Sequence, residues 1–241
     1  MFVNIESIND INWFRYYGKG EDSGLNRKFA SDPNYKKSIL SMLPDELIEE
    51  KKGGFVHIDV MDGVFVPNKN FDPEIVKKYA KKHKMINDVH IMVSEPKIET
   101  PKYIKAGADI VTFHYEAVEC PKCVKKIADM CHESKVKVGI SIKPKTPVKK
   151  IIDLLPLMDL VLVMSVEPGK GGQKFMPSAL RKIKKLRKII DKNNLNCLIE
   201  VDGGINNVTG QKCRKAGADI LVAGSYLFGH DDYKERIESL R

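Results

Sequence analysis

The stretch Lys105-Ala-Gly-Ala-Asp-Ile110 occurs a second time in this chain, as Lys215-Ala-Gly-Ala-Asp-Ile220. Each copy lies where a helical pattern ends and an apolar run begins. Glycine accepts the left-handed backbone conformation that commonly ends a helix, and the small alanines allow a helix to pack closely on a strand. The repeat therefore predicts that one module, a helix followed by a strand, is used at least twice.

The same alternation extends along most of the chain. Nearly continuous apolar runs, as expected of strands buried on both faces, occur at residues 36–41, 54–60, 88–93, 109–114, 136–142, 159–164, 197–201 and 219–224. Helical patterns lie between them, for example at residues 73–83, 121–134, 147–155, 177–192 and 208–216. Such alternation predicts right-handed βαβ units around a parallel sheet. Eight units in a chain of this length favour an α/β fold closed into a (β/α)8 TIM barrel.

The barrel pattern begins only after a long polar segment. Residues 1–34 contain scattered aromatics without a clear period, and we interpret them as an N-terminal extension. Residues 35–241 then form a single catalytic barrel domain. The first crossover between strands is short, because residues 45–52 allow roughly two helical turns.

Composition limits the classes of function. The chain has 241 residues and a net charge of +9, so nucleic-acid binding has to be considered. However, the lysines alternate with apolar residues in helical stretches, which predicts solvated outer helix faces and no nucleic-acid partner. No apolar run approaches the roughly 18 residues of a membrane helix, and the start of the chain does not resemble a secretory signal.

The cysteines indicate a reducing compartment. Their number is five and their spacing is irregular, so a disulfide framework is not expected and we predict a cytoplasmic protein. The pair in Cys120-Pro-Lys-Cys123 leaves a zinc or redox site as a minor alternative.

Ionisable residues lie at the ends of several predicted strands, where barrels build their active sites. His57 and Asp59 are two residues apart on one strand and therefore point to one face, the barrel interior. With His90 and Asp202 they make a set of two imidazoles and two carboxylates, which suits Zn²⁺, Fe²⁺, Co²⁺ or Mn²⁺. His114 ends the fourth predicted strand.

Glycine-rich loops follow the last three predicted strands. Glycines let backbone N–H groups approach an anion closely, and barrels often bind phosphate in these loops. The loop residues are Gly169, Lys170, Gly171 and Gly172, then Gly203 and Gly204, then Gly224 and Ser225. Three methionines at strand ends, Met61, Met92 and Met164, either fill the core or form a polarizable wall above a reacting centre.

Together these motifs resemble the ribulose-phosphate 3-epimerase family. The resemblance runs in order through roughly residues 36 to 241, and its most specific stretches are Ser38-Ile-Leu-Ser41, His57-Ile-Asp-Val-Met-Asp-Gly63, Asp88-Val-His-Ile-Met-Val93, Val166-Glu-Pro-Gly169, Gly171-Gly-Gln-Lys-Phe-Met176 and Val201-Asp-Gly-Gly204. It implies a ribulose-phosphate-binding type of barrel and an isomerase. The expected reaction is the interconversion of D-ribulose 5-phosphate and D-xylulose 5-phosphate in the non-oxidative pentose phosphate pathway.

The resemblance also implies roles for single residues. One divalent metal ion per subunit, Zn, Fe(II), Co or Mn, would be bound by His57, Asp59, His90 and Asp202. Asp59 and Asp202 would be the acid and base. Substrate would contact Ser38, His90, Gly169, Lys170, Gly171, Gly172, Gly203, Gly204, Gly224 and Ser225, under the wall of Met61, Met92 and Met164. We expect a homo-oligomer, with a dimer as the first choice, and no membrane partner.

The chain departs from the family pattern at a few positions. The family has Ala-Pro before Ser38, an aromatic residue at position 170 and a histidine at position 64, where this chain has Lys36-Lys37, Lys170 and Val64. Three alternatives stay open at this point. They are an epimerase acting on a six-carbon substrate such as allulose 6-phosphate, a phosphate-binding aldolase or decarboxylase barrel, and a nucleic-acid-binding protein.

Overall fold

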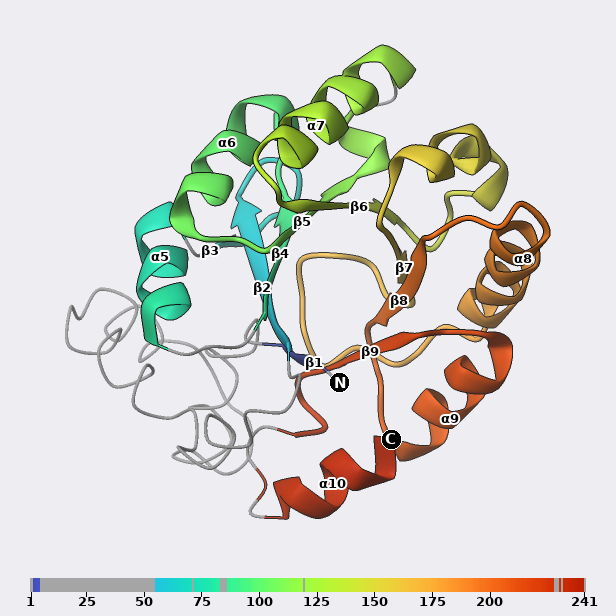
Figure 1. Ribbon diagram of the computed structural model, residues 1–241. Coiled ribbons are helices and arrows are strands. Elements are labelled where there is room, and N and C mark those ends of the chain that lie inside the picture. The colour runs from blue at the N-terminus through green and yellow to red at the C-terminus, as the bar shows by residue number, and fades with distance from the viewer. Residues whose placement is uncertain are drawn as a thin grey trace.

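A ring of parallel strands forms the centre of the molecule (Figure 1). The computed structural model describes residues 2–4, 55–70, 72–82, 86–118, 120–227, 230 and 232–240. Within them the ring consists of β1 (Phe2–Asn4), β2 (Phe55–Asp62), β4 (Ile86–Met92), β5 (Ile110–His114), β6 (Lys137–Ile142), β7 (Leu160–Met164), β8 (Leu198–Asp202) and β9 (Ile220–Ala223). The sheet is closed because β1 pairs in parallel with both β9 and β2. The short β3 (Lys69–Asn70) adds an antiparallel pair to β2.

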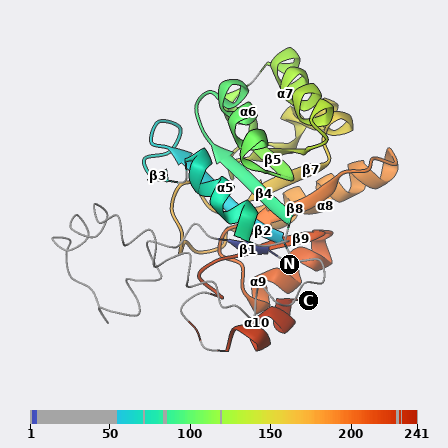
Figure 2. The ribbon, with the colours of Figure 1, turned by 60° about the vertical axis from the view of Figure 1, so that its left-hand side comes forward.

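Helices surround this ring, as Figures 1 and 2 show. They are α5 (Pro73–Lys82), α6 (Pro96–Ala106), α7 (Pro121–Glu133), α8 (Ser178–Lys192), α9 (Asn207–Ala216) and α10 (Tyr233–Leu240). The predicted (β/α)8 class is therefore confirmed. At both copies of the repeated stretch the helix ends on a left-handed glycine, Gly107 with φ 98° and Gly217 with φ 107°. The repeat thus has the structural meaning that its sequence predicted.

The first barrel strand is a segment for which the sequence shows no strand pattern. Phe2 pairs with Phe55 on one side and with Val222 on the other, so Phe2–Asn4 occupies the place between β2 and β9. Three residues are too few to show a strand period, which explains why the pattern gives no signal there. The predicted strand at 36–41, with Ser38, and the predicted helix at 45–52 lie outside the described residues.

The helix predicted for residues 147–155 is wrong in type. The chain forms two 3₁₀ segments there instead, η2 (Val148–Lys150) and η3 (Ile152–Leu157). Pro156 lies within the second segment and has no N–H to continue an α-helical ladder, and it also disfavours the α conformation of the residue before it. The apolar spacing correctly indicates helical turns, and in the second segment the proline opposes an α-helix.

Alternation along the strands decides where polar groups lie. In β2 the residues Val56, Ile58 and Val60 belong to the core between the sheet and the helices, so the residues between them point into the ring. Inside the ring, residues of β7 and β9 form an apolar cluster, namely Leu160, Leu162, Met164, Ile220 and Val222. The inward residues of β2, β4 and β8 instead include the buried histidines and acids His57, Asp59, Asp88, His90, Glu200 and Asp202. This contrast places the candidate site at β2, β4 and β8.

Candidate metal centre and phosphate pocket

Four buried side chains meet inside the barrel. His57 and Asp59 come from β2, His90 from β4 and Asp202 from β8, and each offers one ligand atom within 4.8 Å of the others. Asp59 and His90 are direct partners in the pairing of β2 with β4. Two imidazole nitrogens and two carboxylate oxygens are a donor set that divalent transition metals accept. The residues present therefore fit a metal ion at this position.

Asp59 is the central member of the set. Its Oδ1 lies 2.7 Å from Nδ1 of His90 and 3.3 Å from Nε2 of His57. Burial acts to raise the pKa of Asp59, but the two neighbouring imidazoles outweigh it and hold the pKa well below its usual range. Asp59 is therefore ionised, which both a metal ligand and a general base require.

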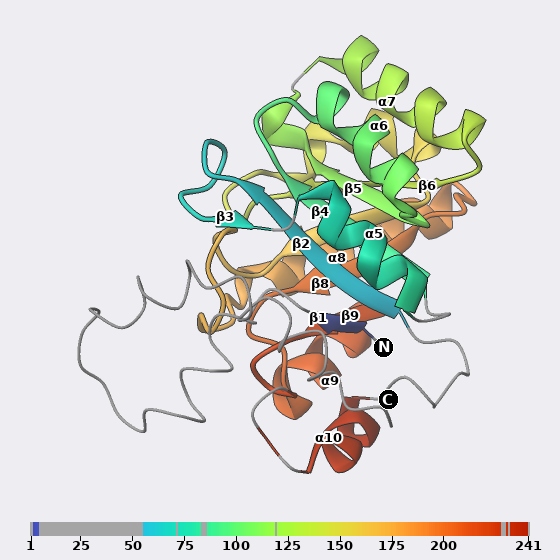
Figure 3. The same cartoon turned by 90° about the vertical axis from the view of Figure 1, so that its left-hand side faces the viewer.

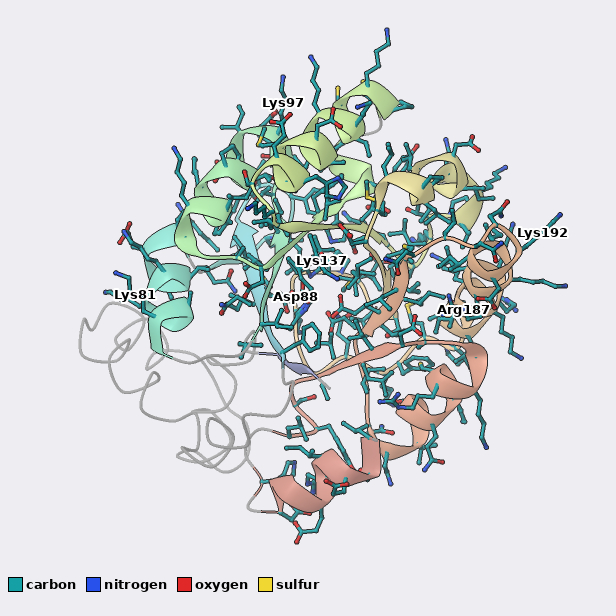
Figure 4. All side chains as sticks on the ribbon, viewed as in Figure 1. Lys81, Asp88, Lys97, Lys137, Arg187 and Lys192 are labelled. Atoms are coloured by element: carbon teal, nitrogen blue, oxygen red, sulfur yellow. The ribbon has the colours of Figure 1, made fainter. Side chains whose placement is uncertain are left out.

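The opposite side of the His57 ring faces two buried acids. Its Nδ1 lies 2.6 Å from Oδ2 of Asp88 and 3.4 Å from Oε1 of Glu200. Burial acts to lower the pKa of His57, but the charges of Asp88, Asp59 and Glu200 raise it well above the usual value. Figure 4 shows Asp88 inside the ring of strands, whereas Lys81, Lys97 and Lys192 point outward.

His57, Asp88 and Glu200 form a second group that converges within 4.8 Å. Burial and the charge of Asp88 raise the pKa of Glu200, which favours its neutral form. Nδ1 of His57 is already engaged by Asp88 in the second group, whereas its Nε2 faces Asp59 in the first group. We therefore assign the candidate metal position to the first group, and the acids of the second group orient the imidazole of His57.

A further imidazole lies behind His90. Nε2 of His114 is 2.9 Å from Nε2 of His90, and Nδ1 of His114 is 3.1 Å from Oε2 of Glu116. Burial lowers the pKa of His114 to about 4. Burial acts against ionisation of Glu116, but its hydrogen bonds with His114, Thr146 and the Lys143 backbone lower its pKa to about 2. The Phe65 ring packs against the His114 ring, and their centroids are 4.8 Å apart. The Lys143 ammonium lies 3.9 Å from the centroid of the Phe65 ring.

The predicted glycine loops line one pocket beyond the strand ends. In Figure 1 the segment between β7 and α8 crosses the middle of the ring. Three residues, Met92, Met164 and Asp202, join the pocket to the strand ends that carry the ligand set. The other predicted residues in the lining are Gly169, Lys170, Gly171, Gly172, Gly203, Gly204, Gly224 and Ser225.

Two loop glycines need to be glycine. Gly169 has φ +97°, and a Cβ there would lie 2.6 Å from Cβ of Val66. Gly204 has φ +61°, and its Cβ would lie 2.5 Å from the backbone nitrogen of Phe175. The side-chain amide of Asn68 also donates to the Gly169 carbonyl at 2.6 Å. The loop between β2 and β3 is thus packed against the segment after β7. Figure 3 shows both loops at the end of the barrel where β2 ends.

The remaining predicted residues have different outcomes. Met61 packs with Val66 and Met92 in a small apolar cluster but does not line this pocket. Among the described residues, no converging group of three or more ligand side chains contains a cysteine, so Cys120 and Cys123 have no support as a zinc site. Glu116 was missed, because a single acid in the turn after a strand carries no distinguishing pattern.

Comparison with known proteins agrees with this geometry. The model of the ribulose-phosphate 3 epimerase family matches residues 37–228. The chain is 42% identical over 212 residues to a ribulose-phosphate 3-epimerase of Bacillus subtilis, covering 87% of this chain and 96% of that protein. It is 40% identical over 228 residues to the chloroplastic ribulose-5-phosphate-3-epimerase of Arabidopsis thaliana, covering 91% of this chain and 80% of that protein.

Solved structures share the fold at low sequence identity. A 3-keto-L-gulonate-6-phosphate decarboxylase of Vibrio cholerae superposes with a TM-score of 0.62 at 13% identity, covering 86% of this chain and 90% of that one. A 3-hexulose-6-phosphate synthase gives 0.57 at 20% identity, with coverages of 76% and 84%. These likenesses establish the barrel and not the reaction.

The fold and the site define a (β/α)8 barrel enzyme with a buried group of histidines and aspartates that can bind a metal ion. The sequence comparisons are more specific. This chain belongs to the ribulose-phosphate 3-epimerase family and is an isomerase. In the described part of the chain, no helix has the length and apolar character needed to cross a membrane.

Proposed function

We propose that this chain inverts C3 of D-ribulose 5-phosphate to give D-xylulose 5-phosphate, as a step of the non-oxidative pentose phosphate pathway in the cytoplasm. The observation that carries the proposal is that Asp202 belongs both to the buried ligand set and to the glycine-lined pocket. A substrate whose phosphate lies among the loop glycines would therefore bring its carbon chain to the acids. A homodimer is the assembly that we propose.

The ligand set would hold one divalent ion, with Zn²⁺, Fe²⁺, Co²⁺ and Mn²⁺ as the candidates. Such an ion would supply Lewis-acid stabilisation of the negative charge that develops on the substrate oxygens. The ligands would be His57, Asp59, His90 and Asp202, which are the four buried donors within 4.8 Å of one another.

The proton transfers are assigned to the two aspartates. Inversion requires that a proton leaves one face of C3 and that another arrives on the opposite face. Asp59 is on β2 and Asp202 is on β8, and the strands β9 and β1 lie between them in the sheet. We propose that one carboxylate accepts the C3 proton, that the other donates, and that the roles exchange in the reverse reaction.

Phosphate recognition falls to backbone groups of the loops. Gly203 and Gly204 follow β8, Gly224 and Ser225 follow β9, and all four line the pocket. Loops after the last two strands of such barrels are frequent phosphate sites. Met92 and Met164 line the pocket beside Asp202, where they would keep water away from the reacting carbon.

The test is a coupled epimerase assay on ribulose 5-phosphate, with metal analysis of the same sample. We expect turnover and about one divalent ion per chain. Asp59→Asn and Asp202→Asn should each reduce kcat by at least about 100-fold, the low end of what acid–base groups contribute, while the thermal midpoint stays near that of the original chain.

The matched control is Asp219→Asn. Asp219 pairs with Arg187 at 3.0 Å and accepts from the Ile199 backbone, so it also loses hydrogen bonds when it is substituted. It precedes β9 rather than following a strand, and its loss should leave kcat unchanged. Near-normal turnover in either site variant would refute the acid–base assignment, and faster turnover of allulose 6-phosphate would refute the proposed substrate.

A further inference from the structure

We propose that Glu116 and His114 act as positioning residues, which hold the His90 imidazole with Nδ1 turned to the metal and its proton on Nε2. The inference rests on the metal site of the proposed function. It concerns two residues outside the ligand set, which form a line of contacts from His90 through His114 to Glu116. His90 and His114 are fully buried, and the Glu116 side chain is 16% exposed.

The direction of the hydrogen bonds in this line is set at Glu116. Its Oε1 accepts from the backbone N–H of Lys143 at 2.8 Å and from the hydroxyl of Thr146. A backbone N–H can only donate, so this end of the carboxylate is an acceptor. The other oxygen, Oε2, faces Nδ1 of His114, and a carboxylate oxygen can only accept. His114 therefore carries a proton on Nδ1.

The next contact follows from the first. His114 is fully buried, with His90 on one side and the Phe65 ring beside it, and burial disfavours a second proton on its ring. A neutral imidazole that donates from Nδ1 must accept at Nε2. The contact of 2.9 Å to His90 is thus a hydrogen bond donated by Nε2 of His90. Nδ1 of His90 lies 2.7 Å from Oδ1 of Asp59, and a metal ion bound in the ligand set would take the lone pair of this nitrogen in place of the proton that it otherwise donates to the carboxylate.

The two imidazoles of the metal site are therefore oriented in different ways. His57 is held directly, because its Nδ1 lies 2.6 Å from Asp88 and its Nε2 faces the ligand set. His90 is held indirectly, because a second imidazole stands between it and the acid. Residues that fix the tautomer of a metal-binding histidine typically change metal affinity about 10- to 100-fold when they are lost.

The decisive variant is Glu116→Gln, which keeps the shape and replaces one oxygen by an NH₂ group. The N–H of Lys143 requires an oxygen at the position of Oε1, so the NH₂ group must face Nδ1 of His114. It would donate there and force the proton of His114 to Nε2. His90 would then have to accept at Nε2 and carry its own proton on Nδ1, where the metal would bind.

We expect Co²⁺, titrated into the full metal-free chain in competition with a chelator, to bind Glu116→Gln about 10- to 100-fold more weakly than the original chain. The matched control is Asp159→Asn. Asp159 likewise accepts from a histidine, His132 at 3.0 Å, and from a backbone N–H, that of Val138 at 2.9 Å. It precedes β7 and has no contact with the ligand set, so the Co²⁺ affinity of this variant should be unchanged.

A second pair of variants tests the same point if Glu116→Gln does not fold. His114→Gln and His114→Leu are both uncharged, but only glutamine offers an acceptor to His90. Leucine should weaken Co²⁺ binding at least about 10-fold more than glutamine, and equal affinities would overturn the proposal. In chain labelled with ¹⁵N-histidine and loaded with Zn²⁺, the ring nitrogens of His90 should show the proton on Nε2, and a proton on Nδ1 would overturn it too.

The failure of this inference differs from failure of the proposed metal site. If the original chain binds Co²⁺ and Glu116→Gln binds it equally well, the positioning role is wrong and the metal site stands. If the original chain does not bind Co²⁺, Zn²⁺, Fe²⁺ or Mn²⁺ at all, the metal site and the positioning role fail together.

Discussion

At the scale of single residues, Lys170 is the pocket residue that departs from the family pattern. Its side chain is exposed, it belongs to the pocket lining, and its carbonyl accepts from the Gln173 amide at 2.7 Å. A lysine ammonium near an anionic substrate contributes through a screened interaction, so its effect should fall as salt is added.

The prediction concerns Lys170→Phe, assayed on ribulose 5-phosphate over a salt series. An exposed charge pair is worth about 0.2–1 kcal/mol, which corresponds to a change of about 1.5- to 5-fold in KM between low and high salt. The original chain should show this salt dependence and the variant should lose it. Lys174→Phe is the control, because Lys174 is also exposed but lies outside the pocket lining. An identical salt dependence in all three proteins would make Lys170 a bystander.

The convergence of the candidate ligand residues could be predicted from the sequence because their positions follow local rules. His57 and Asp59 are two apart on an apolar strand, and the ends of parallel strands meet at one edge. The protonation pattern could not be predicted in this way. It depends on contacts between residues far apart in the sequence, such as Glu116 with Thr146 and His57 with Asp88.

At the scale of elements, α9 begins directly after the Gly203–Gly204 loop. The Asn206 side chain accepts from the N–H groups of Val208 and Thr209, and the Thr209 hydroxyl closes a capping box with the Asn206 backbone. The same hydroxyl donates to the Gly204 carbonyl at 2.9 Å. The cap therefore joins the start of the helix to the loop that we assign to phosphate binding.

We predict that Asn206→Ala lowers the free energy of unfolding by about 1 kcal/mol, since an N-cap side chain contributes roughly that much. For a chain of this size the thermal midpoint should fall by about 2–4 °C. Asn207→Ala is the control, because Asn207 is the exposed first residue of the helix and provides no cap. Equal midpoints for the two variants would contradict a stabilising role for this cap.

Most elements are predictable because burial on two faces leaves a continuous apolar run, as in β7 and β9. The helix α6 is harder to predict from the sequence, because Pro101 lies within it and its apolar residues do not form a strong stripe along one face. The segments η2 and η3 show a further limit, since the periodicity that indicates a helix does not distinguish a 3₁₀ helix from an α-helix.

At the scale of the whole molecule, closure of the barrel is the property that is hardest to predict from local sequence patterns. It is completed by the pairing of Phe2–Asn4 with β2 on one side and with β9 on the other.

The distribution of charge over the molecule follows from the orientation of the helices. Helix α8 buries Ala179, Ile183, Leu186 and Ile190 against the barrel, so its basic residues face outward. The net charge of +9 thus reflects the outer helices and not the interior, which contains the acids.

Acid stability is a property of the whole molecule that depends on Glu116, which links the turn after β5 to the segment after β6. The groups that face its carboxylate are His114, Thr146, the N–H of Lys143 and, at longer range, the Lys182 ammonium. The pKa of Glu116 is lowered to about 2 from an ordinary 4.5. A lowered pKa in the folded state stabilises the fold fully above the ordinary value, and this stabilisation is lost as the pH falls toward 2.

A difference of this size corresponds to about 3 kcal/mol. We therefore predict that the free energy of unfolding of the original chain falls more steeply with acid below pH 4.5 than that of Glu116→Gln. His114, whose pKa is lowered to about 4, adds a fall in the same direction in both proteins. The measurement is urea unfolding from neutral pH to about pH 3, where the stability difference between the two chains should shrink. Parallel curves through this range would show that the Glu116 carboxylate does not contribute to acid stability.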